Sequence, residues 1–217
     1  MCAESSQLPP LSQTVVSTVS RSVDGPVPGR IIAVRHAATE WSKVGRHTGR
    51  TDLPLEPDGR ADAADLGRRL AGLQPALVLS SPLRRALDTS SLAGFGSGVE
   101  TSDLLLEMDY GDYEGLTTPQ IREIRPGWDL FSEGFPGGET IAQVGARADR
   151  LLEQLRGQSS LAGADVLVFA HGHLLRVLAA RWLGLEAADA RRFALRAGKF
   201  AVLGWEHEWR VLTGWNL

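Results

Sequence analysis

The chain has 217 residues, of which 43% are hydrophobic and 23% are charged, a composition typical of a globular domain with a core of its own. Its formal net charge of −3 argues against a nucleic-acid-binding protein, which usually carries a basic excess. The single cysteine, Cys2, excludes an internal disulfide framework and a thiolate metal cluster, and it favours a reducing, cytoplasmic location.

Residues 1–29 are expected to form a disordered N-terminal extension. This segment is rich in Ser, Thr, Pro and Val, and it shows neither helical nor strand periodicity. It has no basic n-region followed by an apolar run of signal-peptide length, and no segment of the chain approaches transmembrane length. We therefore expect residues 30–217 to form a single domain without a membrane partner.

From Arg30 onward, short apolar runs alternate with helical patterns. The runs at 31–34, 76–80 and 165–172 are typical of short strands buried on both faces. Ser81-Pro82 predicts the start of a helix that continues to about Leu92. Residues 139–155 predict an amphipathic helix, because apolar side chains recur at steps of three and four: Ile141, Val144, Ala148, Leu151, Leu152 and Leu155.

Two further patterns complete the expected fold. A shorter apolar stripe of Leu66, Leu70 and Leu73 follows Asp58-Gly59. Residues 199–215 predict two strands joined by a tight turn around 206–208. Together these elements predict an α/β fold, a three-layer α/β/α sandwich whose mainly parallel sheet carries an antiparallel strand near the C-terminus.

Polar side chains follow three of the expected strands. The first strand ends in Arg35-His36, the second is followed by Arg85 in the first turn of a helix, and the third ends in His171-Gly172. In open α/β sheets, ligands bind outside the carboxyl ends of the strands. Two histidines and an arginine are therefore expected to converge, although they lie far apart in the sequence.

Five segments in this order resemble motifs of the histidine phosphatase superfamily, the phosphoglycerate-mutase-like group, and they look most like its bacterial broad-specificity acid phosphatases. The segments are "RHAATEWS" (35–42), "GRHTGRTDLPLEPDGR" (45–60), "SSPLRRALDTS" (80–90), "LLLEMDYGDYEG" (104–115) and "FAHGHLLR" (169–176). The resemblance implies that His36 is a phosphorylated nucleophile, that Glu107, expected at the end of an apolar strand, is the proton donor, and that His171, expected to be protonated when phosphate is bound, is a second catalytic histidine. It also implies a phosphate-binding set: Arg35, Arg85, Ser42, Thr48, Gly49 and Gly172.

Several assignments have rivals. Asp109, Asp112 and Glu114 compete with Glu107 for the role of proton donor, although an acidic cluster is more often a solvated surface. His47 and His173 are expected to be either surface or second-layer residues, or else functional ones. Four aromatic residues are expected either to line the mouth of the site or to belong to the core: Trp41, Tyr110, Trp128 and Phe131. For Trp41 the core is favoured.

The first motif departs from the usual pattern. Ala37 replaces a glycine after the nucleophile, which is tolerable only if φ is negative and the phosphate does not press on that Cα. Ala38 replaces a glutamate, and Ser42 replaces an asparagine that would donate to phosphate. These three changes motivate one alternative, a catalytically weak protein that binds a phosphorylated ligand on this fold.

The expected activity is hydrolysis of small phosphomonoesters without a metal or other cofactor, through a phosphohistidine. The main alternative within the family is a phosphoglycerate mutase. Residues 116–140 lack the paired arginines and the Pro-Pro run of mutases, and isolated Arg122 and Arg125 follow a helix start at Thr118-Pro119, which places them on a solvated face. The expected partner is the small phosphorylated substrate, and the terminal hairpin or an exposed helix offers a surface for a homodimer.

Overall fold

A six-stranded sheet with the order β3-β2-β4-β1-β5-β6 forms the centre of the computed structural model, which describes residues 27–217. The strands are β1 (Arg30–Arg35), β2 (Leu77–Ser80), β3 (Glu100–Thr101), β4 (Asp165–Ala170), β5 (Phe200–Glu206) and β6 (Trp209–Gly214). Strands β1 to β4 are parallel, whereas β5 runs antiparallel to both β1 and β6. The expected mainly parallel sheet with a C-terminal antiparallel strand is confirmed.

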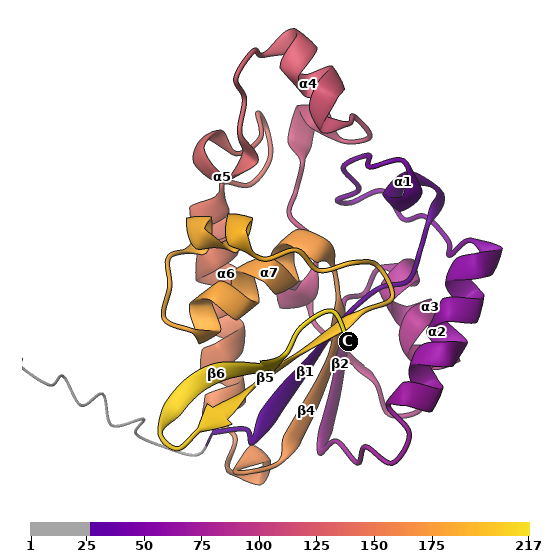
Figure 1. Ribbon diagram of the computed structural model, residues 1–217, viewed down its shortest axis with the longest axis vertical. Coiled ribbons are helices and arrows are strands. Elements are labelled where there is room, and N and C mark those ends of the chain that lie inside the picture. The colour runs from indigo at the N-terminus through magenta and orange to yellow at the C-terminus, as the bar shows by residue number, and fades with distance from the viewer. Residues whose placement is uncertain (1–26) are drawn as a thin grey trace, which may run out of the picture.

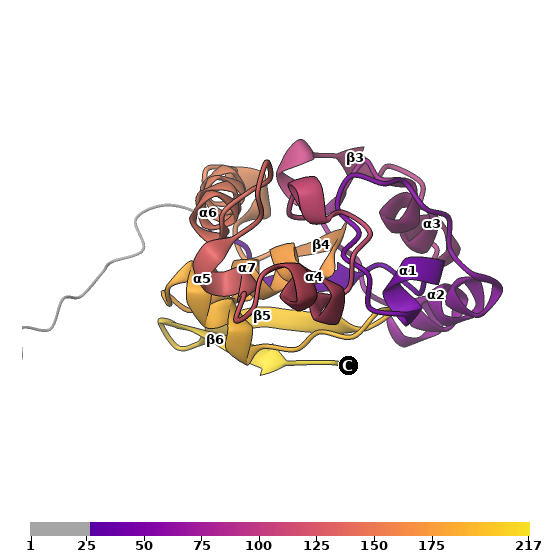
Figure 2. The ribbon, with the colours of Figure 1, turned by 90° about the horizontal axis from the view of Figure 1, so that it is seen from above.

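Helices cover both faces of the sheet, so that the expected three layers are present (Figure 1). The helices are α1 (Glu40–Lys43), α2 (Pro57–Arg69), α3 (Arg84–Leu92), α4 (Thr118–Ile124), α5 (Leu130–Glu133), α6 (Ile141–Arg156) and α7 (Gly172–Trp182). Helices α2 and α3 lie on one side of the sheet, and α6 and α7 lie on the other (Figures 1 and 2). Helices α1, α4 and α5 stand beyond one end of the strands and form a cap over it.

Strands β1 and β4 are apolar from Ile31 to Val34 and from Val166 to Ala170, because both of their faces are buried there. Successive residues of β1 alternate between two cores: Ile31 packs on the side of α6 and α7, and Ile32 packs with Leu66 of α2. In β4, Val168 and Phe169 alternate in the same way. A continuous apolar run is therefore the pattern of a central parallel strand, as expected from the sequence.

Helix α6 bears out the most regular pattern in the sequence. It begins after Thr140, whose hydroxyl accepts a hydrogen bond from the backbone N–H of Gln143, while the Gln143 side chain accepts one from the Thr140 N–H. The predicted stripe is buried from Val144 to Leu155. The terminal hairpin is also confirmed, with its turn between Glu206 and Trp209.

Two expected boundaries were wrong. Helix α3 begins at Arg84 and not at Ser81-Pro82, because the Ser81 hydroxyl contacts the Leu83 N–H and His171 instead of capping a helix that starts there. Glu107 follows a 3₁₀ turn (Asp103–Leu105) and not a strand. Only two residues, Glu100 and Thr101, pair with β2 in this part of the chain.

The described part of the chain begins slightly before the expected domain boundary at Arg30. The carbonyl of Val27 accepts a hydrogen bond from the Gly163 N–H, and the Pro28 carbonyl accepts one from Trp205 Nε1. Residues 27–29 are thus attached to the domain. The remainder of the expected extension, residues 1–26, lies outside the described residues.

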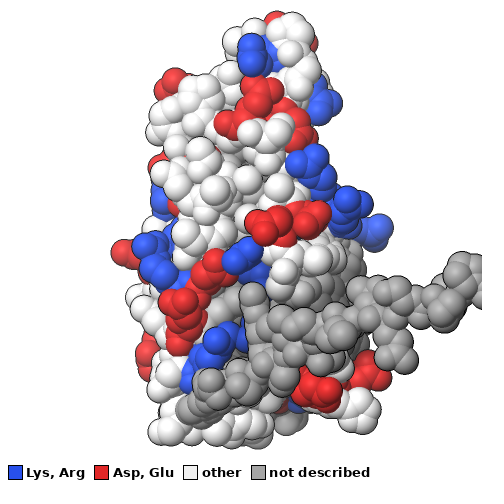
Figure 3. Space-filling model, turned by 90° about the vertical axis from the view of Figure 1, so that its left-hand side faces the viewer, with Lys and Arg blue, Asp and Glu red and all other residues white. Residues whose placement is uncertain are grey.

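Charged side chains of both signs are interspersed on the face seen from the left of Figure 1 (Figure 3). Within residues 27–217, no helix combines the length and the apolar character needed to cross a membrane.

Candidate active site

The register of the sheet brings three strand ends together. Arg35 pairs with Ala170 across β1 and β4, and Ser80 pairs with Phe169 across β2 and β4. The ladder continues one residue further, since the His36 N–H donates to the Ala170 carbonyl at 2.9 Å. Residues that are far apart in the sequence therefore leave the sheet at one edge, as their positions at the ends of parallel strands predict.

The His36 imidazole is held in one tautomer. Its Nδ1 lies 2.8 Å from the Ala37 carbonyl oxygen, which can only accept, so Nδ1 carries the proton and Nε2 keeps a lone pair. Burial lowers the pKa of His36 well below its ordinary value, and the positive charges of Arg85 and Arg35 lower it further. The ring is therefore neutral, and its basic nitrogen makes no hydrogen bond within the described chain.

Arg35 lies against Gly172 at the start of α7. Its Nη1 donates to the Leu195 carbonyl at 2.6 Å, and its Nε is the one buried side-chain nitrogen or oxygen without a hydrogen-bond partner among residues 27–217. A Cβ on Gly172 would lie 3.0 Å from Arg35 Cζ, so the absence of a side chain there allows the guanidinium its place. The unpaired donor marks Arg35 as a group built to bind something else.

Arg85 is fully buried, and every arm of its guanidinium is bound. Its Nη groups donate to the carbonyls of Thr48, Gly49 and Thr51, and its Nε donates to His171 Nδ1 at 3.2 Å. Burial lowers the pKa of Arg85, while Glu107 raises it. Arg85, a predicted phosphate ligand, thus also connects the loop 48–51 to α3 and to His171 at the end of β4.

His171 is also fully buried, and its ring centroid is 5.2 Å from that of His36. Because its Nδ1 accepts from Arg85, its Nε2 carries the proton and donates to the Ser81 hydroxyl at 2.8 Å. Burial, followed by the charge of Arg85, lowers the pKa of His171 well below its usual range. The free protein therefore holds a neutral imidazole here; the positive charge expected in the phosphate-bound protein stays a prediction.

The Glu107 carboxylate lies at the N-terminus of α7. Its Oε1 accepts from the N–H groups of Met108 and Leu174, and its Oε2 accepts from the His173 N–H at 3.0 Å. The carboxylate thus satisfies two of the donors that a helix leaves unpaired in its first turn. Three hydrogen bonds leave about one of the roughly four acceptor positions of the carboxylate open.

Arg147 of α6, which the sequence did not single out, holds the segment that carries Glu107. Its Nη1 donates to the carbonyls of Leu104 and Leu106, and its Nη2 donates to that of Glu107. It also forms a nearly buried ion pair with Glu139 at 2.8 Å. The amphipathic pattern places Arg147 beside the buried stripe, but only the fold shows that its partners are backbone carbonyls.

These groups surround a cavity of about 250 Å³. Its lining is Arg35, His36, Ser42, Gly45, Arg46, His47, Thr48, Glu107, Tyr110, Thr118, Gly172, His173 and Arg176. Arg85 and His171 do not line it and lie fully buried behind its wall. A nucleophilic nitrogen, an unpaired guanidinium donor and a carboxylate thus face one small space.

The model of the histidine phosphatase superfamily (branch 1) matches residues 31–217, which is most of the chain. The chain belongs to the histidine phosphatase superfamily. An acid phosphatase of Mycobacterium tuberculosis is 43% identical over 186 residues, which are 85% of this chain and 90% of that protein. A sedoheptulose 1,7-bisphosphatase of Saccharomyces cerevisiae is 38% identical over 184 residues, covering 72% of this chain and 68% of that protein.

The fold agrees with that assignment. A solved structure of an open reading frame product from Mycobacterium tuberculosis superimposes with a TM-score of 0.81 at 43% identity, covering 87% of this chain and 97% of that one. The chain is thus a phosphatase of this superfamily, whose general mechanism proceeds through a phosphohistidine. The expected family, fold and phosphatase activity are confirmed.

Three predicted phosphate ligands of this histidine phosphatase have other hydrogen-bond partners in the structure. Ser42 lines the cavity, but its hydroxyl donates to the Thr39 carbonyl and accepts from the Thr39 N–H in the cap of α1. The Thr48 hydroxyl donates to the Arg46 carbonyl. The Gly49 N–H donates to Glu114, and Gly49 lies outside the cavity lining. Their roles toward phosphate stay predictions.

The unusual Ala37 directs its methyl group away from the cavity. It packs with Leu55 and Ala63 in a small apolar cluster, and its N–H donates to the Thr89 hydroxyl at 3.0 Å. Its φ is not positive, since the only positive-φ residues other than glycine within residues 27–217 are His207 and Asn216. The φ condition under which alanine is tolerable at this position is therefore met, and Ala37 does not line the cavity.

The rival acids occupy other positions. The Glu114 carboxylate accepts from the N–H groups of Gly49 and Thr51, which braces the same loop that binds Arg85. Asp109 accepts from the Gly111 N–H and lies 3.5 Å from Arg50 Nε. None of Asp109, Asp112 and Glu114 lines the cavity, whereas Glu107 does.

His47 is not a surface residue. It is 8% exposed and lies among the rings of Tyr110, Trp128 and Phe135, and burial lowers its pKa to about 4. Trp128 belongs to the core, Tyr110 both packs in the core and lines the cavity, and Phe131 is partly buried. The core assignment for Trp41 was wrong, because Trp41 is half-buried beneath the Arg46 guanidinium and outside the core.

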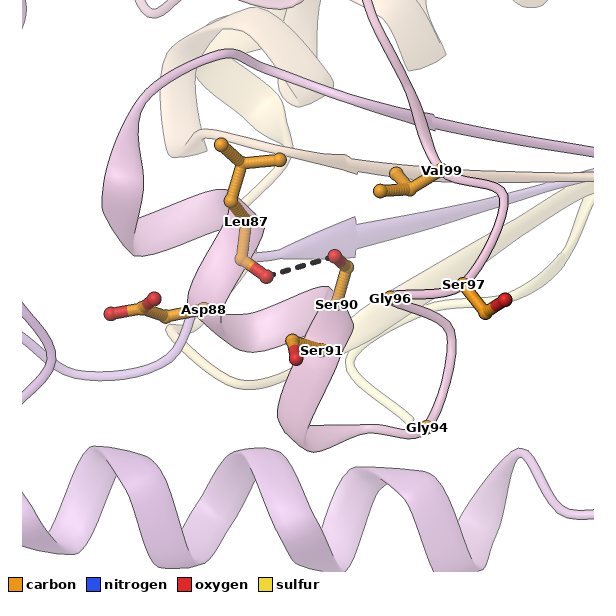
Figure 4. Close-up of a pocket in the computed structure, with 8 residues that line it drawn as sticks. All are labelled: Leu87, Asp88, Ser90, Ser91, Gly94, Gly96, Ser97 and Val99. Carbon is orange, nitrogen blue, oxygen red and sulfur yellow. Dashed lines mark hydrogen bonds between the residues drawn. The ribbon is translucent and has the colours of Figure 1, made fainter.

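A second hollow of about 440 Å³ lies between α3 and the following loop (Figure 4). Serines, glycines and two apolar residues line it, and its one charged side chain, Asp88, pairs with Arg84. It contains none of the predicted site residues. Although this hollow is the larger one, its lining offers neither a nucleophile nor an unpaired cation.

Gly172→Ala is expected to reduce kcat/KM toward p-nitrophenyl phosphate by about tenfold, because the new methyl group displaces the Arg35 guanidinium by a few tenths of an ångström. Steady-state kinetics with circular dichroism checks this. The control is Gly157→Ala at the end of α6, where a Cβ meets nothing closer than 3.6 Å and activity should not change. Unchanged kcat/KM in Gly172→Ala would show that Arg35 needs no such precise placement.

His47→Phe is expected to make folding less sensitive to acid. His47 is neutral in the fold with a pKa of about 4, so its contribution to stability is complete above the unfolded pKa of about 6.5 and is lost as pH falls toward 4. The free energy of unfolding of wild type should therefore drop by about 3 kcal/mol more than that of the variant between pH 7 and pH 4. Urea titrations at several pH values measure the free energy of unfolding of both proteins. The prediction is contradicted if wild type and variant lose the same free energy between pH 7 and pH 4.

Proposed function

We propose that this phosphatase hydrolyses small phosphomonoesters in two displacements at His36, without a metal ion. The observation that carries the proposal is the tautomer of His36: the Nδ1 proton is held by the Ala37 carbonyl, so the lone pair on Nε2 belongs to a neutral, buried ring on the cavity wall. A neutral imidazole in that state is a nucleophile without prior loss of a proton.

In the first displacement, His36 Nε2 attacks phosphorus as the bond to the ester oxygen breaks. The leaving oxygen takes a proton from the Glu107 carboxyl group. Oε2 accepts only one hydrogen bond, so its other lone pair can carry this proton. The transferring phosphoryl group spreads negative charge over three equatorial oxygens. Arg35 supplies an unpaired Nε–H for them, and the buried charge of Arg85 adds electrostatic stabilisation, joined by His171 if it becomes protonated when phosphate binds.

In the second displacement, Glu107 accepts a proton from water while the water oxygen attacks phosphorus. The bond between phosphorus and His36 Nε2 breaks, inorganic phosphate leaves, and the imidazole returns to its starting tautomer. Throughout, Nδ1 keeps its proton on the Ala37 carbonyl at 2.8 Å, so the ring does not rotate between the two steps. The same carboxylate thus acts as acid and then as base, and no proton is left over.

Hydrolysis is favoured over the mutase alternative by the position of the isolated arginines. Arg122 is exposed and donates to the Trp128 carbonyl, and Arg125 is exposed and pairs with Glu133. Neither lines the cavity, so neither is placed to hold a phosphoglycerate carboxylate there. The names of the two relatives described above, an acid phosphatase and a sugar bisphosphatase, point the same way.

The cavity volume of about 250 Å³ suits a small phosphorylated metabolite rather than a phosphoprotein loop. A cytoplasmic location is in keeping with the single cysteine of the sequence.

His36→Ala should abolish turnover of p-nitrophenyl phosphate, because it removes the nitrogen that takes the phosphoryl group. Loss of the nucleophile is expected to lower kcat by at least about 10³-fold. Release of p-nitrophenol with purified protein measures it, and wild type should work equally well in the presence of EDTA. Undiminished turnover by His36→Ala would refute the nucleophile, and activity lost with EDTA would refute the metal-free mechanism.

On the acid side, kcat/KM should fall only at a pH far below the pKa of an ordinary histidine. His36 must be neutral to attack, and because its pKa is lowered, its active form persists as pH falls and is lost only when pH passes through that lowered pKa. Wild type should therefore keep most of its kcat/KM at about pH 5, where a free imidazole is almost entirely protonated. A limb centred near pH 6.5 contradicts this.

A further inference from the structure

A nearly buried ion pair, Arg147 with Glu139, lies close to the active site but outside its cavity. Arg147 is 6% exposed on the core-facing side of α6, with Val144 and Leu151 one turn away on either side. Neither member of the pair lines the cavity. A buried ion pair is often no more stabilising than apolar residues of similar size, so packing alone does not account for this one.

The pair has the geometry of a rigid fork. Arg147 Nε donates to Glu139 Oε1 at 3.1 Å, and Arg147 Nη2 donates to Glu139 Oε2 at 2.8 Å. Two parallel hydrogen bonds of this kind fix the orientation of both side chains and not only their separation. The remaining donors and acceptors of the pair therefore point in defined directions.

These remaining groups hold one stretch of backbone, residues 104–109, on both sides of Glu107. Arg147 donates to three carbonyls of the stretch, that of Glu107 among them. Glu139 accepts from the Asp109 N–H at 2.9 Å, and its own N–H donates to the Asp109 carbonyl at 2.9 Å. The backbone from which the Glu107 side chain extends is thus bound before and after that residue.

This stretch has little other support from regular structure. Residues 106–110 belong to no helix or strand, so no ladder of backbone hydrogen bonds fixes them. The Glu107 carboxylate is held at its far end by the N–H groups of His173 and Leu174 in α7. A proton donor must lie within hydrogen-bond reach of the leaving oxygen, and a misplacement of about 1 Å can cost about 100-fold in rate.

We propose that Arg147 and Glu139 are positioning residues for the proton donor, which hold the Glu107 backbone so that its carboxyl group lies beside the leaving oxygen. The proposal rests on the proposed function, in which Glu107 protonates that oxygen. It predicts a defect that depends on the leaving group. An alkoxide must take a proton as it leaves, whereas p-nitrophenolate is a stable anion and leaves without one.

Two substrates, glycerol 2-phosphate and p-nitrophenyl phosphate, test this dependence. The measurement is kcat/KM, which covers the steps up to formation of the phosphohistidine, so that the later role of Glu107 as a base does not enter. Glu107→Gln sets the reference. Its kcat/KM should fall by about 100-fold or more for glycerol 2-phosphate and far less for p-nitrophenyl phosphate.

Arg147→Lys and Glu139→Gln should show the same selective defect in weaker form. Lysine keeps the charge but has one nitrogen in place of the fork, and glutamine keeps one acceptor oxygen but removes the charge. Each variant should lower kcat/KM for glycerol 2-phosphate by about 10- to 100-fold and for p-nitrophenyl phosphate by no more than about threefold. Because both substrates are assayed on one preparation, the ratio does not depend on the folded fraction.

The matched controls are Arg181→Lys and Asp149→Asn. They alter another arginine–carboxylate pair of α6, whose nitrogen and oxygen lie 2.9 Å apart and which makes no hydrogen bond to residues 104–109. Both controls should keep the wild-type ratio. Glu139 is 19% exposed, so Glu139→Gln serves by itself if Arg147→Lys is too unstable to purify.

The outcomes separate this inference from the proposed function. Wild type that turns over neither substrate refutes the phosphatase, and Glu107→Gln without a selective loss refutes the proton donor. With both of these in order, the positioning role is refuted if Arg147→Lys and Glu139→Gln lose activity equally toward the two substrates or lose none. The same selective loss in the controls also refutes it.

Discussion

The buried guanidinium of Arg85 is the interaction on which the rest of the site depends. It is fully buried, and instead of a carboxylate its partners are three backbone carbonyls of the loop 48–51 and the ring of His171. Such an arrangement satisfies the donors of a buried charge without neutralising it. Burial lowers the pKa of His36 and of His171 well below the ordinary value, and the charge that remains on Arg85 lowers both further, so both imidazoles stay unprotonated.

A second set of contacts fixes the position of Glu107. Glu107 accepts hydrogen bonds from the first turn of α7, the helix whose first residue, Gly172, lies against Arg35. Arg147 holds the Glu107 backbone from the other side. Glu107 and Arg35, the proposed proton donor and phosphate ligand, are thus positioned by one helix terminus, so that the distance between them is set by the backbone rather than by flexible side chains.

The elements that the sequence predicted are those whose pattern is local. The stripe of α6 and the apolar runs of β1 and β4 follow from side-chain periodicity, and the convergence of His36 with His171 follows from the parallel arrangement of their strands. The family motifs added Glu107, which no periodicity indicates.

The missed features depend on contacts between residues distant in the sequence. The three carbonyls bound by Arg147 precede it by about forty residues, and no local pattern marks a carbonyl as an acceptor. Ser81 resembles a helix cap in sequence, but its hydroxyl serves a histidine ninety residues away. In the same way, His47 is polar in sequence and buried in the fold, because the rings of Tyr110, Trp128 and Phe135 surround it.

The segment that leads into the cap helix α4 is joined by backbone hydrogen bonds to His47, which directly precedes the loop 48–51. The N–H of His47 donates to the Leu116 carbonyl, and the Gly115 N–H donates back to the His47 carbonyl. These bonds do not depend on which side chains the cap carries, so the outer residues of α4 and α5 are free to vary while the loop that binds Arg85 keeps its position. Sequence divergence on the outer surface of α4 and α5 is therefore expected to leave the geometry around Arg85 unchanged.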